Sequence, residues 1–123
     1  MYRILCIDDE ASIMKLYQDF LENEDLEIVV ACSVRKGLEI LRQYSVDLVI
    51  TDMIMPEMDG IELLRSLHHV AESPPVIAVS GGGSYLNGRE LLLIAEVMGV
   101  RGTLHKPFTR SELLSMVHRV LAE

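Results

Sequence analysis

Acidic residues follow two separate apolar segments of this chain, and a lysine stands at the end of a third. Asp8 and Asp9 come directly after the first segment, Asp52 comes after another, and Lys106 closes the last. Carboxylates that lie close together raise one another's pKa unless a cation lies between them. Mg²⁺ takes oxygen ligands and is commonly held by a carboxylate or two plus water. If the segments meet in the fold, these residues predict a magnesium site with a lysine beside it.

The simpler alternative is that each aspartate caps the helix after it and that Lys106 is a surface lysine. Two adjacent acids, however, exceed what a single helix cap needs. Opposite an acidic cluster, the ammonium group of Lys106 could hold a carboxylate or a phosphate as a point charge. These considerations favour a functional cluster over isolated caps.

Ser80 and the glycines after it form a second candidate site. The segment Ser80–Gly83 could present a hydroxyl and free backbone N–H groups to an anion. It is not a Walker loop, because no Lys-Ser or Lys-Thr follows it, and no G-x-G-x-x-G follows the first apolar segment. Alone, a serine such as Ser80 is most often a residue of a turn or a helix cap.

The apolar segments alternate with stretches of helical periodicity. They are continuous in hydrophobicity, as strands buried on both faces are, and comprise Ile4–Ile7, Ile28–Cys32, Leu48–Ile50, Val76–Val79 and Val100–His105. Strands that alternate with helices predict a parallel α/β sheet with helices on both faces. Ligands of such sheets bind beyond the carboxyl ends of the strands. Asp8, Asp52, Ser80 and Lys106 would meet at that edge.

Helix boundaries carry local signals of their own. The predicted N-terminal caps are Ser33, Asp59 with Glu62, and Thr109 with Glu112. Gly99 stands where a glycine commonly ends a helix.

Composition and charge restrict the class of protein. The chain has 123 residues, of which 50% are hydrophobic, so we expect one domain over residues 1–123. Its formal net charge of −8 argues against nucleic acid or an anionic membrane as a partner. No apolar run approaches the roughly 18 residues of a membrane span, and the acidic N-terminus is unlike a signal peptide. Cys6 and Cys32 lie in apolar runs, so we expect buried thiols and a reducing, cytoplasmic location.

In this order and spacing, the residues resemble the receiver domain of two-component response regulators. The resemblance extends from Arg3 to Leu121 and depends on Asp8-Asp9, Asp52 within DLVITDMIMPEMDG, Ser80 after PVIAV, and Lys106-Pro107-Phe108. Each motif is weak alone, and the combination is specific. The resemblance implies a flavodoxin-like (βα)5 fold, in which a doubly wound parallel sheet of five strands has the order 2-1-3-4-5.

The resemblance also implies which residues take part in phosphorylation. Asp52 would accept a phosphoryl group from a phosphohistidine of a histidine kinase or histidine phosphotransfer protein. Asp9, Asp52 and the backbone carbonyl of Ile54 would bind Mg²⁺, with Asp8 acting through water. Two further residues, Ser80 and Lys106, would contact the phosphoryl oxygens.

Three smaller expectations follow from the resemblance. Gly81 would give the phosphoryl group clearance, and the Lys106-Pro107 bond would be cis. The charge added by phosphorylation would draw Ser80, its loop and the helix after it toward the phosphoryl oxygens. The surface formed by the last strand and the last two helices would then change its binding to an output protein or to a second copy.

The run Leu91–Ile94 bears on that surface. These are consecutive apolar residues, which point all round a helix, so at least one should face outward. An exposed apolar patch would serve an unidentified output protein or self-association. Burial by neighbouring loops is the alternative.

Two other functions stay open. A small Mg²⁺-dependent phosphohydrolase would also form an aspartyl phosphate, but such enzymes have a D-x-D arrangement after the first strand and an inserted cap, which this chain lacks. The other alternative is a receiver-shaped module that works without phosphorylation. In its favour, Thr103 stands where the family usually has an aromatic switch residue. Tyr85 is the nearest aromatic substitute for that switch residue. We expect no enzyme with an external substrate, only self-catalysed phosphotransfer and autodephosphorylation.

Autodephosphorylation should be slow. Ile54 and Gly82 lie two positions beyond Asp52 and Ser80, and neither side chain can orient an attacking water. We therefore expect the phosphorylated form to persist far longer than seconds in Mg²⁺ buffer, as followed by intact mass over time. A half-life of seconds would contradict this expectation.

Overall fold

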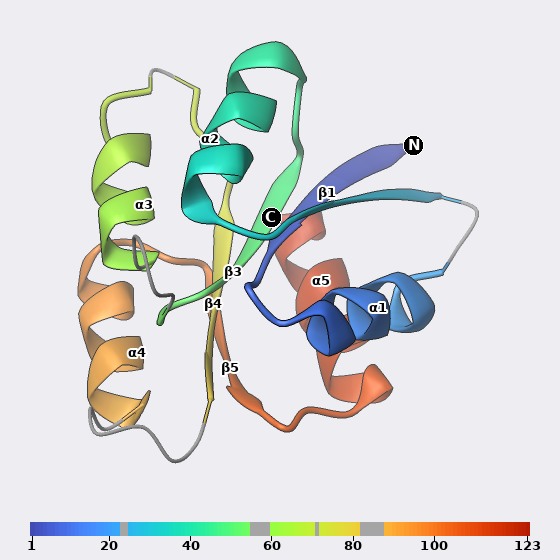
Figure 1. Cartoon of the computed structure of the whole chain (residues 1–123). Helices are drawn as coiled ribbons and strands as arrows, with labels where there is room; N and C mark the ends of the chain where they lie inside the picture. The colour runs from blue at the N-terminus through green and yellow to red at the C-terminus, as the bar shows by residue number, and fades with distance from the viewer. Residues whose placement is uncertain (23–24, 55–59, 71, 82–87) are drawn as a thin grey trace.

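Strands and helices alternate along the whole chain. The computed structural model describes residues 1–22, 25–54, 60–70, 72–81 and 88–123. In chain order the elements are β1 (Tyr2–Ile7), α1 (Ala11–Phe20), β2 (Leu26–Ala31), α2 (Val34–Gln43), β3 (Leu48–Asp52), α3 (Gly60–Leu67), β4 (Val76–Gly81), α4 (Gly88–Val97), β5 (Gly102–Lys106) and α5 (Arg110–Ala122). Figure 1 shows the sheet between two layers of helices. Within the described ranges, none of these helices is long and apolar enough to cross a membrane.

The sheet is parallel throughout, with the strand order β2-β1-β3-β4-β5. This confirms the flavodoxin-like order that the resemblance implied. Ile7 of β1 lies opposite Thr51 of β3. The residues that follow them, Asp8 and Asp52, therefore lie side by side at the carboxyl edge of the sheet. This is the edge at which doubly wound sheets bind their ligands.

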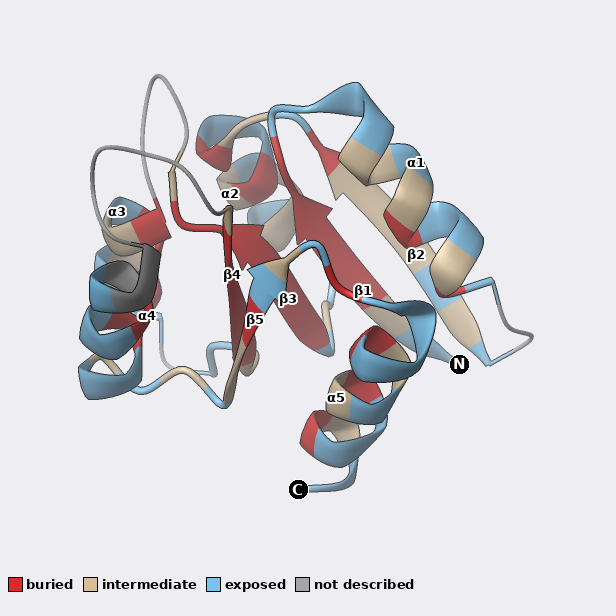
Figure 2. Ribbon diagram, turned by 90° about the horizontal axis from the view of Figure 1, so that it is seen from below, coloured by how far each residue is buried: buried red, intermediate tan, exposed pale blue. Residues whose placement is uncertain are grey.

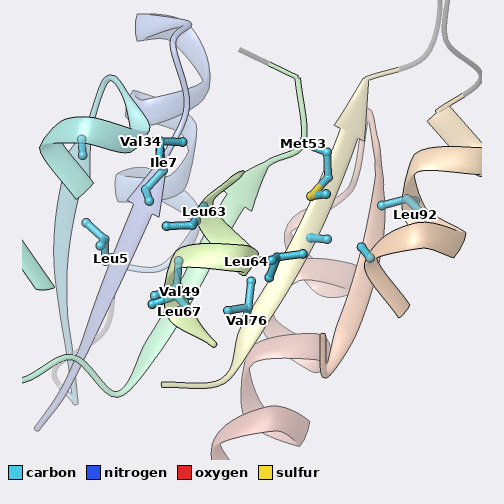
Figure 3. Close-up of a cluster of buried hydrophobic side chains, with 13 residues drawn as sticks. Leu5, Ile7, Val34, Val49, Met53, Leu63, Leu64, Leu67, Val76 and Leu92 are labelled. Carbon is cyan, nitrogen blue, oxygen red and sulfur yellow. The ribbon is translucent and has the colours of Figure 1, made fainter. Parts of the chain in front are cut away.

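Alternation of side chains along the strands divides the core into two layers. Leu5 and Ile7 face the layer that contains α2, α3 and α4, whereas Ile4 and Cys6 face the layer that contains α1 and α5. Figure 2 shows buried strands between helices whose outer faces are exposed. Figure 3 shows the first layer, in which leucines of α3 pack over β1, β3 and β4. Burial on both faces explains why the strands are continuously apolar.

The signals at three helix ends are confirmed. Ser33 Oγ accepts a hydrogen bond from the backbone N–H of Lys36 at 3.2 Å. Thr109 and Glu112 form both hydrogen bonds of a capping box. Gly99 follows α4 with a φ of +94°, a left-handed conformation that glycine adopts without steric cost.

The prediction of two buried thiols is wrong for Cys32. Because β2 ends at Ala31, Cys32 lies in the loop after the strand and is exposed. Cys6 in β1 is buried as predicted, and burial, followed by the charge of Asp8, raises the pKa of its thiol. The last strand also begins later than predicted, at Gly102.

The apolar run of α4 faces both inward and outward, as predicted. Leu92 packs in the core, whereas Leu93 is 55% exposed and Ile94 is 44% exposed. The side chain of Leu91 lies outside the described part of the chain. Exposed apolar residues therefore remain on α4, although Leu92 is not one of them.

Gly60→Ala should destabilise the fold. A Cβ at Gly60 would lie 2.9 Å from the carbonyl oxygen of Asp52 and 2.9 Å from Cα of Met53, both of them backbone atoms next to the site. We expect the free energy of unfolding to fall by about 2–3 kcal/mol in urea denaturation. Gly81→Ala is the matched control, because its new Cβ would meet only Lys106 Cδ, at 3.9 Å. Equal losses in the two variants would contradict the steric argument.

Candidate functional site

One lysine joins two buried carboxylates at the carboxyl edge of the sheet. Lys106 Nζ donates a hydrogen bond to Asp8 Oδ2 at 2.7 Å and another to Asp52 Oδ2 at 3.2 Å. Glu10 Oε1 is 3.9 Å from the same nitrogen. The ends of β1, β3 and β5 thus meet at a single cation. The Lys106–Pro107 bond is cis, as the resemblance implied.

Burial makes this cluster sensitive to charge. Asp8 is 0% exposed and Asp52 is 5% exposed, and carboxylates at such depth are costly unless they are paired and hydrogen-bonded. Two backbone N–H groups donate hydrogen bonds to these carboxylates. That of Glu10 donates to Asp8 Oδ1 at 2.9 Å, and that of Ile54 donates to Asp52 Oδ1 at 3.2 Å. Lys106 offers one positive charge for two negative ones. The excess negative charge would be neutralised by a further cation.

The pKa of Asp52 reflects opposing effects. Burial raises it and outweighs the charge of Lys106, which lowers it; the charge of Asp8 raises it further. For Lys106, burial alone lowers the pKa, but the hydrogen bond that it donates to Asp8 and the charges of Asp52 and Asp8 together raise it. The lysine therefore remains a cation at neutral pH and holds both carboxylates.

Ser80 lies beside Asp52 with an unused hydroxyl. Val79 pairs with Asp52 in the register of β3 and β4, so Ser80 is one residue nearer the edge. Ser80 is fully buried, and its Oγ has no hydrogen-bond partner among the described residues. A buried hydroxyl in this condition costs about 1–3 kcal/mol. An oxygen of a ligand bound at Asp52 would remove that cost.

Three consecutive acids offer oxygen ligands for a metal ion. One carboxylate oxygen from each of Asp8, Asp9 and Glu10 lies within 4.8 Å of the others, and only Asp8 is buried. Such oxygens suit Mg²⁺, and the exposure of Asp9 and Glu10 leaves space for the waters that Mg²⁺ retains. The predicted ligands were Asp9, Asp52 and the carbonyl of Ile54, with Asp8 acting through water. Sequence reasoning did not single out Glu10, although it directly follows the acid pair.

Thr103, another residue singled out in the sequence, lies away from this cluster. Thr103 of β5 pairs with Ala78 of β4, below the edge, and is half-buried. Asp59, Gly82 and Tyr85 lie outside the described residues, so the predictions made for them stay predictions.

Sequence reasoning did not single out Tyr17, because its spacing from Ile13 and Phe20 is that of an apolar helix face. In the structure Tyr17 is fully buried, and its hydroxyl has no hydrogen-bond partner in the described part of the chain. The signal that could have identified it is a phenol hydroxyl on the apolar face of the helix that directly follows the acid pair.

Comparison with known proteins establishes the family. Residues 4–118 match the family model described as the response regulator receiver domain. The chain belongs to this family. The receiver-domain resemblance seen in the sequence is thereby confirmed, and the matched range includes Asp8, Asp52, Ser80 and Lys106.

Curated relatives of this receiver domain include transcriptional regulatory proteins. It is 31% identical over 121 residues to the transcriptional regulatory protein CpxR of Escherichia coli, which covers 98% of this chain and 50% of CpxR. It is 32% identical over 120 residues to the transcriptional regulatory protein GlrR of Escherichia coli, which covers 98% of this chain and 26% of GlrR. The chain thus spans half the length of CpxR and less of GlrR.

Solved structures agree with the fold and the family. A response regulator receiver domain protein from Clostridium thermocellum has a TM-score of 0.88 and 31% identity, covering 99% of this chain and 95% of the other. A CheY-like receiver domain protein from Methanospirillum hungatei has a TM-score of 0.86 and 27% identity, covering 99% and 94%.

Asp52→Asn should change how stability depends on pH. Burial holds the pKa of Asp52 above its ordinary value of 3.8, so this carboxyl binds a proton more tightly in the folded protein than in the unfolded chain. Its contribution to the free energy of unfolding is greatest below pH 3.8 and decreases as the pH rises toward the raised pKa. Urea unfolding between about pH 4 and pH 7 should show wild type losing stability relative to Asp52→Asn. A difference that is independent of pH would contradict this.

Proposed function

We propose that this receiver domain accepts a phosphoryl group on Asp52 from a phosphohistidine of a histidine kinase or histidine phosphotransfer protein. The observation that carries the proposal is the pair of hydrogen bonds from Lys106 Nζ to Asp8 and Asp52. The lysine favours the ionised form of Asp52, which is the nucleophilic form. The unpartnered hydroxyl of Ser80 beside it adds a directional donor for a phosphoryl oxygen.

In the proposed reaction, an ionised Oδ of Asp52 forms a bond to phosphorus while the bond from phosphorus to the donor imidazole breaks. The electron pair of the broken bond returns to the imidazole nitrogen, and the ring leaves neutral because its other nitrogen carries a proton. Charge on the equatorial phosphoryl oxygens must be neutralised during this transfer. Lys106 can turn toward these oxygens because its ammonium group has three donors on a flexible stem. Ser80 Oγ donates to another oxygen.

Mg²⁺ is the proposed cofactor. Asp9, Asp52 and the carbonyl of Ile54 would hold it, with Asp8 acting through water and Glu10 close by. When bound, the ion supplies additional positive charge to the phosphoryl oxygens. The excess negative charge of the acids would otherwise repel an incoming phosphoryl group.

The proposed role is that of a switch rather than of an enzyme with an external substrate. The phosphoryl group stays on Asp52 and adds nearly two negative charges at the edge of the sheet. We propose that Ser80 and α4 move toward it, which changes the surface formed by α4, β5 and α5. The exposed side chains of Leu93 and Ile94 lie on α4, where an output protein in the cytoplasm, or a second copy, would bind.

Intact mass spectrometry tests this proposal. The chain is incubated with Mg²⁺ and phosphoramidate, a small donor with the same phosphorus–nitrogen bond as phosphohistidine. We expect wild type to gain the mass of one phosphoryl group and Asp52→Asn to gain none, because the variant lacks the nucleophilic oxygen. Chelation of Mg²⁺ should greatly slow the gain.

Each alternative function has its own outcome in this experiment. Labelling that persists in Asp52→Asn would place the acceptor on another residue. Repeated turnover of a small phosphate ester would favour a phosphohydrolase. Wild type that stays unlabelled by both phosphoramidate and a phosphohistidine protein would favour a module that works without phosphorylation.

A further inference from the structure

Tyr17 in α1 carries a buried hydroxyl that the proposed chemistry does not use. Its side chain is 0% exposed, and its hydroxyl has no hydrogen-bond partner among the residues described. Among the same residues, Ser80 Oγ is the other buried side-chain oxygen in this condition. A hydroxyl buried without a partner destabilises a fold, so phenylalanine would suit this position better if packing were its sole role.

Tyr17 packs on the face of the sheet to which the acidic cluster also belongs. Cys6 of β1 and Ile50 of β3 belong to the core layer that contains Tyr17. Side chains two residues apart along a strand share a face, so Asp8 and Asp52 extend the face of Cys6 and Ile50. Burial raises the pKa of Tyr17, and the neighbouring Cys6, Asp8 and Asp52 raise it further. The buried phenol and both carboxylates thus share one face of the sheet.

The ring of Tyr17 is also fixed to the segment that carries Lys106. It stacks on Phe108, with ring centroids 5.8 Å apart and an interplanar angle of 22°. Phe108 lies two residues beyond Lys106 and also meets Phe20 edge-on, with centroids 6.4 Å apart. The ring is therefore held by aromatic packing while its hydroxyl is left without a protein acceptor in the described residues.

We propose that Tyr17 is a positioning residue, whose hydroxyl donates a hydrogen bond to Asp8 when Lys106 turns from Asp8 to the phosphoryl group on Asp52. The inference rests on the proposed function of Asp52. Asp8 Oδ2 receives its 2.7 Å hydrogen bond from Lys106, and Asp8 is fully buried. Departure of the lysine therefore leaves Asp8 with the backbone N–H of Glu10 at Oδ1 and takes the donor away from Oδ2. Asp52 needs no such replacement, because its carboxylate becomes an acyl phosphate.

A double-mutant comparison tests this contact without any phosphorylation. Tyr17→Phe removes the hydroxyl and keeps the ring on Phe108. In the otherwise wild-type protein, we expect it to raise the thermal unfolding midpoint by about 2–5 °C, because an unpartnered hydroxyl is lost. In a Lys106→Met background, where Asp8 Oδ2 has lost the lysine as its donor, we expect the same change to lower the midpoint. Midpoint shifts of the same sign in both backgrounds would overturn the proposal.

Tyr44→Phe is the matched control for this comparison. Tyr44 is 53% exposed, so removal of its hydroxyl should leave the midpoint unchanged in both backgrounds. A sign reversal that Tyr44→Phe also shows would overturn the assignment to Tyr17.

The rate of phosphoryl uptake is a second test, which does not require Lys106→Met to fold. With Mg²⁺ and phosphoramidate, we expect Tyr17→Phe to be labelled about tenfold more slowly than wild type, the loss that one hydrogen bond to a charged group produces. Tyr44→Phe should be labelled at the wild-type rate. A purely structural role would not slow a variant that is more stable than wild type.

The two proposals fail in distinguishable ways. Equal labelling rates for wild type and Tyr17→Phe would overturn the positioning role and leave Asp52 as the acceptor. Wild type that takes up no phosphoryl group would overturn the function of Asp52 and the positioning role together.

Discussion

A single ammonium group between two buried carboxylates is the interaction on which the rest of this receiver domain depends. Asp8 and Asp52 lie side by side because β1 and β3 are neighbours in register, and their burial is tolerable because Lys106 bonds to both. Lys106 belongs to β5, which β4 separates from β3. The ion network therefore joins the first, third and last strands, and the site requires β1, β3, β4 and β5 to be paired.

Around this network, two hydroxyl groups lack acceptors among the described residues and two carboxylates share one cation. Ser80 Oγ and the Tyr17 hydroxyl are buried without partners in the part of the chain that the structure describes, and one cation serves two anions. Ser80 shares a strand face with Ala78, whereas Tyr17 packs in the opposite core layer. A phosphoryl group on Asp52 would engage Ser80 and Lys106, and the lysine's departure would engage Tyr17. Such an arrangement favours two alternative states over a graded response.

The sequence predicted those features whose physics is local or topological. Continuous apolar runs gave the strands, and Ser33 and Thr109 gave helix starts, because each depends on a few neighbouring residues. The meeting of Asp8 and Asp52 followed from the rule for parallel sheets. Cys32 was predicted wrongly because an apolar run does not mark where pairing of the strand stops, and β2 stops at Ala31. Tyr17 was missed because its ring matches an apolar stripe, and only the packing of α1 reveals the unpaired hydroxyl.

A crystal structure of this receiver domain with Mg²⁺ and beryllofluoride, which mimics a phosphoryl group, tests the central claim most directly. The account predicts the beryllium bonded to an Oδ of Asp52, with Lys106 Nζ moved from Asp8 to one fluorine and Ser80 Oγ donating to another. A structure in which Asp52 carries no beryllofluoride, or in which Lys106 still bridges Asp8 and Asp52 beneath it, would contradict the account.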